Sequence, residues 1–135
     1  MTVIFKNKTY KSYQDLLDKE YKDKPITILT NGERNAKLKK GITEKADVML
    51  AHLLPHNKAD MLMDRKVKRT ICPFAIMAQC HEACLNTAGR GGIIKKGETT
   101  NTIEIARLRR TLLFLDDREK FLAQLHKEIT AFVIR

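Results

Sequence analysis

The hydrophobic and polar positions near the N-terminus alternate and then change period. Residues 2–12, TVIFKNKTYKS, alternate apolar and polar side chains around a short polar turn, which predicts a small β-hairpin. After it the apolar spacing becomes helical, at Tyr13, Leu16, Leu17 and Tyr21. Ser12 stands at the N-cap of this helix, and Asp15 follows three residues later, as in a capping box. We therefore expect a hairpin and a helix within residues 1–24.

The middle of the chain carries a strand pattern followed by a helical pattern. Residues 26–32 combine the β-branched run ITILT with the turn dipeptide NG, which predicts a strand that enters a tight turn. Residues 43–54, TEKADVMLAHLL, have helical spacing, and Pro55 would end that helix. Residues 57–70 predict a second short helix or turn that finishes in a basic run.

The strongest helical pattern covers residues 103–135, after a capping box formed by Asn101 and Glu104. It predicts one long helix, or two helices joined at LDD, where Asp116 and Glu119 would cap the second. Its later apolar positions share one face and are expected to be buried, above all at Leu122, Leu125, Ile129 and Phe132. The fold class expected is α+β and mainly helical, with a small N-terminal hairpin and strands, about four helices and a long C-terminal helical region.

Length and composition indicate one folded domain over residues 1–135. Hydrophobic residues make up 43% and charged residues 31% of the chain, which is typical of a globular protein and not of a disordered one. No apolar run approaches the roughly 20 residues of a membrane span, and no export signal opens the sequence. A cytoplasmic location without membrane contact is expected, where cysteines stay reduced or bind metal.

The net charge of +10 predicts a polyanionic partner, with DNA or RNA first. A solvated basic surface and an acidic protein partner are the alternatives. Besides residues 34–40, the cations expected to form a phosphate-binding face are Arg65, Lys66, Lys68, Arg69, Arg90, Lys95, Lys96, Arg107, Arg109 and Arg110. The last three lie in RLRR, where they are expected to point away from Leu108 and Leu112 and to be free for a partner.

All three cysteines fall in one short segment, as Cys72, Cys80 and Cys84, with His81 beside the second. Three thiolates and one imidazole could complete a zinc site, and three cysteines could hold an iron–sulfur cluster with one open iron. In the alternative interpretation, a core helix starts at Pro73 and buries Phe74, Met77, Cys80 and Cys84, because free cysteine packs as a small hydrophobe. Both interpretations stay open.

His52 and His56 are four residues apart, but Pro55 between them favours structural or surface roles.

Three stretches carry a family resemblance: NAKLKKG, CPFAIMAQCHEACLNTAGRGG and ARLRRTLLFLDDREKFLAQLHKEI. Together they resemble phage-encoded gene product 88-like proteins over about residues 34–135. The cysteine region of that family is similar to the opening of radical S-adenosylmethionine enzymes, where three cysteines hold a 4Fe-4S cluster. The resemblance implies Cys72, Cys80 and Cys84 as the cluster ligands. The family continues past the last helix into another strand, so a C-terminal truncation of this chain is an expectation.

These observations favour a small basic phage-type protein of the bacterial cytosol that binds nucleic acid or a nucleic-acid machine. The zinc or iron–sulfur site on the cysteines would accompany that function. One alternative is a radical-type iron–sulfur enzyme or a fragment of one. Another is a host-takeover protein that binds and blocks an acidic host protein. Whether the chain is an enzyme stays open.

Overall fold

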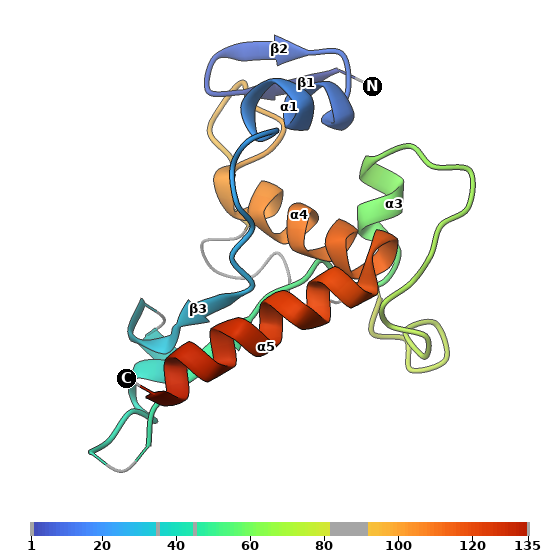
Figure 1. Cartoon of the computed structure of the whole chain (residues 1–135). Helices are drawn as coiled ribbons and strands as arrows, with labels where there is room; N and C mark the ends of the chain where they lie inside the picture. The colour runs from blue at the N-terminus through green and yellow to red at the C-terminus, as the bar shows by residue number, and fades with distance from the viewer. Residues whose placement is uncertain (1, 35, 45, 82–91, 135) are drawn as a thin grey trace.

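The computed structural model describes residues 2–34, 36–44, 46–81 and 92–134. Helices predominate, and two small antiparallel strand pairs accompany them, which confirms the expected α+β class. In chain order the elements are β1 (Val3–Phe5), β2 (Lys8–Tyr10), α1 (Tyr13–Glu20), β3 (Leu29–Asn31), η1 (Gly32–Arg34), α2 (Ala36–Lys39), β4 (Met49–Ala51), α3 (Lys58–Leu62), α4 (Thr102–Asp116) and α5 (Arg118–Ile134). Figure 1 shows the hairpin and α1 above α4, with α5 crossing below.

The N-terminal hairpin and helix follow the prediction. β1 and β2 pair antiparallel, with Phe5 opposite Lys8. Lys6 and Asn7 between them both have positive φ, 49° and 63°, as the two central residues of a type I′ turn require. The Ser12 hydroxyl accepts the backbone N–H of Asp15 at 3.1 Å, so the predicted cap starts α1.

The core lies where the hairpin and α1 meet α3 and α4. The side chains with no exposed surface include Leu16 of α1, Leu54 before α3, and Ile105 and Leu108 of α4. The segment before α4 joins β1, because Thr99 N–H donates to the Ile4 carbonyl at 2.9 Å. The predicted Asn101 cap accepts the N–H of Glu104 at 2.7 Å and fixes the start of α4. Helix α4 is therefore the element on which the others assemble.

The helix predicted over residues 43–54 is wrong. That stretch contains β4, which pairs antiparallel with β3 so that Leu29 lies opposite Ala51 and Asn31 opposite Met49. The strand run ITILT needs a backbone partner, and the pairing that supplies it overrides the local helical spacing. The tight turn predicted after the strand takes the form of the 3₁₀ helix η1, which Gly32 begins; Gly32 also donates its N–H to the Val48 carbonyl at 2.9 Å. A Cβ on Gly32 would stand only 2.7 Å from that oxygen.

The C-terminal region forms two helices, which agrees with the second of the two arrangements expected there. Asp117, and not Asp116, accepts the N–H of Lys120 at 3.1 Å and caps the start of α5. The corner between the helices is packed by Phe114 and Phe121, whose rings meet edge to face at a centroid distance of 5.2 Å. None of the helices within the described ranges is long and apolar enough to cross a membrane.

The burial expected along α5 is wrong for much of its apolar face. Leu122 is 52% and Ile129 45% exposed, whereas Leu125 and Phe132 are half-buried. The helix is held instead at its start by Phe121 and farther along by Glu128. The Glu128 carboxylate accepts the backbone N–H groups of Ile28 and Leu29 at 3.0–3.1 Å. Polar contacts to β3 therefore replace the apolar packing that periodicity predicts.

Candidate functional site

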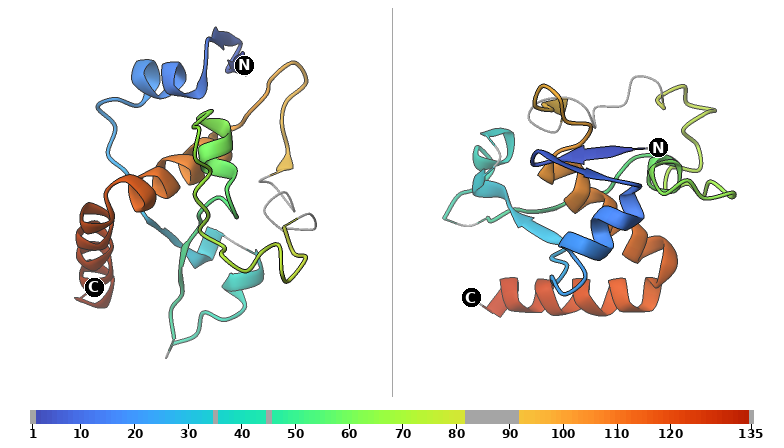
Figure 2. Two further views of the ribbon diagram at one scale, coloured as in Figure 1. Left: turned by 90° about the vertical axis from the view of Figure 1, so that its right-hand side faces the viewer. Right: turned by 90° about the horizontal axis from the view of Figure 1, so that it is seen from above.

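The predicted basic clusters lie in separate parts of the fold. Residues 34 and 36–40 lie beside β3, residues 65–69 follow α3, and Lys95 and Lys96 precede α4 in the chain (Figure 1). The right-hand view of Figure 2, from above, also shows these three segments apart. Arg90 lies outside the described residues. A single phosphate-binding face built from all of these cations therefore stays a prediction.

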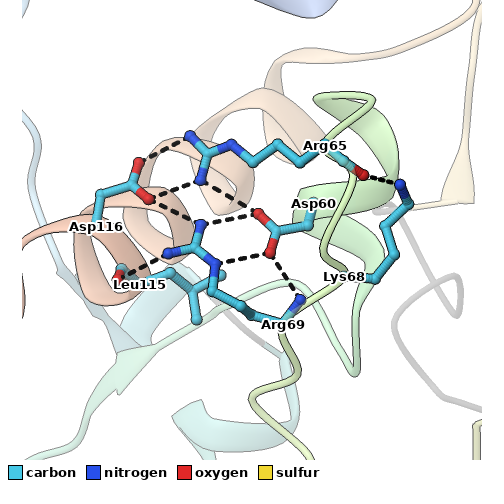
Figure 3. Close-up of polar contacts among 6 residues, drawn as sticks. All are labelled: Asp60, Arg65, Lys68, Arg69, Leu115 and Asp116. Carbon is cyan, nitrogen blue, oxygen red and sulfur yellow. Dashed lines mark hydrogen bonds and ion pairs between the residues drawn. The ribbon is translucent and has the colours of Figure 1, made fainter.

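Two of the predicted nucleic-acid contacts, Arg65 and Arg69, bind carboxylates of the chain itself (Figure 3). Arg69 binds Asp60, which has no exposed surface. Arg65 Nη1 and Nη2 donate to the Asp116 carboxylate at 2.6 and 2.9 Å. Hydrogen bonds from Arg69 lower the pKa of Asp60, and hydrogen bonds from Arg65 lower the pKa of Asp116. These guanidinium groups therefore join α3 and the chain after it to the end of α4.

The arginines of RLRR are also engaged within the chain, so the expectation that they are free is wrong. Arg109 Nη2 donates to the carbonyls of Tyr21 and Lys24. Arg110 Nε donates to the Thr27 carbonyl at 2.7 Å. Arg107 Nη2 lies 3.3 Å from His52 Nδ1. Carbonyl groups of residues 21–27 lie against Arg109 and Arg110, and His52 lies against Arg107, so these three cations are committed to contacts within the chain.

Next to these arginine contacts lies a groove of roughly 910 Å³, which is lined by residues 17–27, α4 and α5. Its apolar lining residues are Leu17, Tyr21, Pro25, Ile26, Leu112, Leu113 and Ala123. Its lining includes two acidic residues, Asp18 and Asp116, and five cations, Lys22, Lys24, Arg109, Lys120 and Lys127. Sequence reasoning identified only Arg109 among these cations, because the others come from separate segments that form no cluster along the chain.

Two of the groove's cations, Lys24 and Arg109, lie over the ring of Tyr21. Lys24 Nζ and Arg109 Cζ each lie 4.9 Å from the centroid of the Tyr21 ring. Burial lowers the pKa of Arg109 and raises that of Tyr21, so the hydroxyl stays neutral at physiological pH. Asp116 is bound by Arg65 and Arg69, which offsets its negative charge. The groove lining therefore combines cations, the Tyr21 ring and apolar side chains.

The cysteine segment does not form the core helix of the alternative interpretation. Residues 72–80 form turns, in which Ala75 N–H donates to the Cys72 carbonyl and Cys80 N–H donates to the Ala75 carbonyl. Phe74 is 68% and Met77 81% exposed, and Cys80 is exposed as well. Burial therefore does not account for the described cysteines. Cys84 lies outside the described residues, so mutual reach of the three sulfurs stays a prediction.

Cys72 is held next to a histidine that spacing alone did not select. Its Sγ accepts the backbone N–H of His56 at 3.3 Å, and its own N–H donates to Thr70 Oγ1 at 2.9 Å. The rings of His56 and His81 lie 6.0 Å apart between centroids. Within the described ranges, no three His, Cys, Asp or Glu side chains already converge as a bound metal ion requires.

Comparison with known proteins gives one family match. A family model described as gene product 88 matches residues 27–135, from the residues before β3 through α5. The β1–β2 hairpin and α1 precede the matched region. No curated protein and no solved structure matches the sequence.

Proposed function

The chain belongs to the gene product 88 family of phage gene products, and on this premise we propose that it binds single-stranded nucleic acid in the groove between residues 17–27, α4 and α5. The observation that carries the proposal is the lining of that groove, which combines four lysines and Arg109 with apolar side chains. Phosphates along a strand would meet the cations, and bases would meet the apolar side chains. The net charge of +10 would draw such a polyanion toward the protein over long range.

The distribution of charge supports a chain-like ligand. Lys22 and Lys24 stand on one side of the groove, and Lys120 and Lys127, seven residues apart on α5, stand on the other. Two turns of α5 separate the latter pair by roughly 10 Å along the helix axis. This is the length of a short run of nucleotides and exceeds a single phosphate. Several backbone phosphates of one strand could therefore be contacted at once.

The apolar lining supports a single strand over a duplex. A duplex presents its phosphates outward and keeps its bases stacked inside, so Tyr21 and the aliphatic side chains would find no base to contact. A single strand exposes base faces, and stacking on an aromatic ring contributes about 1–3 kcal/mol per base without sequence preference. Because Tyr21 is the one aromatic residue among the described residues of the groove lining, little base specificity is expected.

Binding of labelled single-stranded DNA and RNA and of duplexes, measured across a salt series, tests the proposal. Lys120→Glu with Lys127→Glu should weaken single-strand binding and reduce the salt slope by roughly 0.7 for each phosphate that the variant no longer neutralises. Lys95→Glu with Lys96→Glu is the matched control, since it makes the same charge change in exposed residues outside the groove. The control variant should lose less affinity than the groove variant.

Equal losses of single-strand affinity in the two variants would show that binding depends only on net charge, and the groove would then not be the binding site. Absence of measurable binding by the parent at low salt would reject nucleic acid as the ligand. The acidic-protein partner would then become the leading interpretation of the same surface.

A further inference from the structure

Three large apolar side chains are exposed on the turns that follow Cys72. Phe74 is 68%, Ile76 67% and Met77 81% exposed, and they fall within four consecutive residues. Scattered apolar side chains are normal on a protein surface, whereas a cluster marks a contact with a partner or a membrane. We call these three residues the apolar tip, and we propose that it inserts into the surface of an anionic lipid bilayer.

The apolar tip stands on a hydrogen-bonded backbone. Ala75 is 3% exposed, its N–H donates to the Cys72 carbonyl at 3.0 Å, and its carbonyl accepts the Cys80 N–H at 3.1 Å. The Ala78 N–H donates to the Phe74 carbonyl at 2.9 Å. Backbone groups that bond one another lose less when they leave water than groups bonded to water. The turns therefore suit an apolar environment.

The segment that carries the apolar tip is fixed at its base and projects from the fold. Arg69 binds the buried carboxylate of Asp60, and the His56 N–H donates to Cys72 Sγ. In Figure 1 residues 63–81 extend beyond α3, on the side opposite the C-terminus. A projecting segment can meet a flat surface such as a bilayer before the rest of the protein contacts it.

The charge of the same segment favours an anionic surface. Residues 65–81 contain four cations and no Asp or Glu. The two arginines among them bind carboxylates of the chain, whereas Lys66 and Lys68 are exposed on either side of Val67, itself 72% exposed. Lysines beside exposed apolar side chains match an anionic bilayer, because headgroup phosphates attract the cations and the acyl region takes the apolar groups.

Net charge favours lipid over a second copy of the chain as the partner. Each copy carries a charge of +10, so two copies repel each other as their tips approach. The expectation of no membrane contact came from the lack of an apolar span. A surface contact needs no span, because it buries side chains only at the level of the headgroups and the outermost acyl carbons.

Sedimentation with lipid vesicles tests the proposal. The parent should bind vesicles of equal parts phosphatidylglycerol and phosphatidylcholine at low salt, and pure phosphatidylcholine at least about tenfold more weakly. Phe74→Ser with Met77→Ser should lower the partition coefficient for the anionic vesicles at least about tenfold, because two apolar side chains no longer leave water.

A matched control comes from α5. Val133→Ser with Ile134→Ser removes two apolar side chains that are 73% and 78% exposed, and this variant should bind vesicles as the parent does. Circular dichroism of both double variants shows that any loss of binding does not come from unfolding.

A fluorescent reporter measures insertion directly. The chain contains no tryptophan, so Phe74→Trp introduces a single one at the apolar tip. Its emission should shift to the blue on addition of the anionic vesicles, and lipids brominated in their acyl chains should quench it.

Several results would overturn the proposal. One is a parent protein that does not sediment with the anionic vesicles at low salt, and a protein partner with an apolar pocket would then be the leading interpretation of the apolar tip. Others are equal binding of the parent to both kinds of vesicle, equal binding by the tip and control variants, and unchanged Phe74→Trp emission on vesicles. None of these readouts involves nucleic acid, so the two proposals succeed or fail separately.

Discussion

Arg69 holds the buried carboxylate of Asp60 with three donors, since its backbone N–H and Nε each reach Oδ2 at 2.8 Å and its Nη2 reaches Oδ1 at 2.9 Å. Arg69 also donates to the Leu115 carbonyl at 3.0 Å and to Asp116 at 2.8 Å (Figure 3). One side chain therefore joins α3, the approach to Cys72 and the end of α4. This junction makes the chain after α3 an integral part of the fold.

Arg69→Met is expected to destabilise the protein strongly. Breaking a buried ion pair costs about 3–5 kcal/mol, and the second cation on Asp60 together with the partial exposure of Arg69 should reduce this to about 2 kcal/mol. Arg65 is that second cation, at 3.3 Å. Urea unfolding measures the change. Lys66→Met, an exposed position with the same charge change, should stay within about 0.5 kcal/mol of the parent. Equal stability of both variants would show that the network contributes no net stability.

The same network should make the protein sensitive to acid. Arg69 lowers the folded-state pKa of Asp60, and Arg65 lowers that of Asp116, below the ordinary value of 3.8. Stability from a lowered carboxyl pKa is fully present above the unfolded value and is lost as pH falls through the folded value. Urea midpoints should therefore fall steeply below about pH 4 in the parent. Asp60→Asn should be less stable at pH 7 and should show a shallower decline in acid. If the urea midpoints of the parent and of Asp60→Asn fell equally with pH, Asp60 would be excluded as a source of the acid sensitivity.

Local signals in the sequence predicted the elements whose stabilising contacts are local. The Ser12 and Asn101 caps and the helices that follow them are examples, because each hydroxyl or amide bonds a backbone N–H three residues on. Strand β4 was missed because its hydrogen-bonding partner, β3, lies far away in the chain, and nothing within residues 43–54 identifies that partner. For these residues, helical spacing of apolar side chains was a weaker determinant than backbone pairing.

The candidate sites were predictable only in part for the same reason. The sequence grouped Cys72, Cys80 and His81 because they are close along the chain. It did not indicate that His56, which precedes α3, donates its backbone N–H to Cys72 Sγ. The groove draws its cations from residues 22–24, α4 and α5, so no charge cluster along the chain marks it. Conversely, the charge clusters that the sequence does mark, at Arg65 and Arg69 and at Arg109 and Arg110, make contacts within the chain.

Tyrosine ionisation should occur at unusually high pH in the folded protein. The hydrogen bond that Tyr10 donates to Glu20 at 2.5 Å raises its pKa to about 12, and burial does the same for Tyr13. The stability linked to a raised pKa is present below the ordinary value of 10 and is lost as pH rises through about 12. Tyrosinate absorbance should therefore rise late, together with alkaline unfolding. Glu20→Gln should bring one tyrosine back toward its ordinary pKa of 10. Glu119→Gln, on exposed α5, should leave the curve unchanged.

Phe121 should be the main apolar anchor of α5. It is 5% exposed and packs on Phe114 at the corner between α4 and α5, whereas the adjacent Leu122 is 52% exposed. Phe121→Ala removes a buried ring and should cost about 3–5 kcal/mol. Leu122→Ala changes a largely solvated side chain and should cost under about 1 kcal/mol. Urea unfolding of the two variants at equal, dilute protein concentration gives the comparison.

The comparison also tests the exposed apolar face of α5 that periodicity expected to be buried. If Leu122→Ala cost as much as Phe121→Ala, that face would be covered in solution. A second copy of the chain is one such cover, and it would make the parent's unfolding midpoint rise with protein concentration. A midpoint independent of concentration, with only Phe121→Ala destabilised, would instead mean that the ring contact and the Glu128 bonds to Ile28 and Leu29 suffice to hold α5 in place.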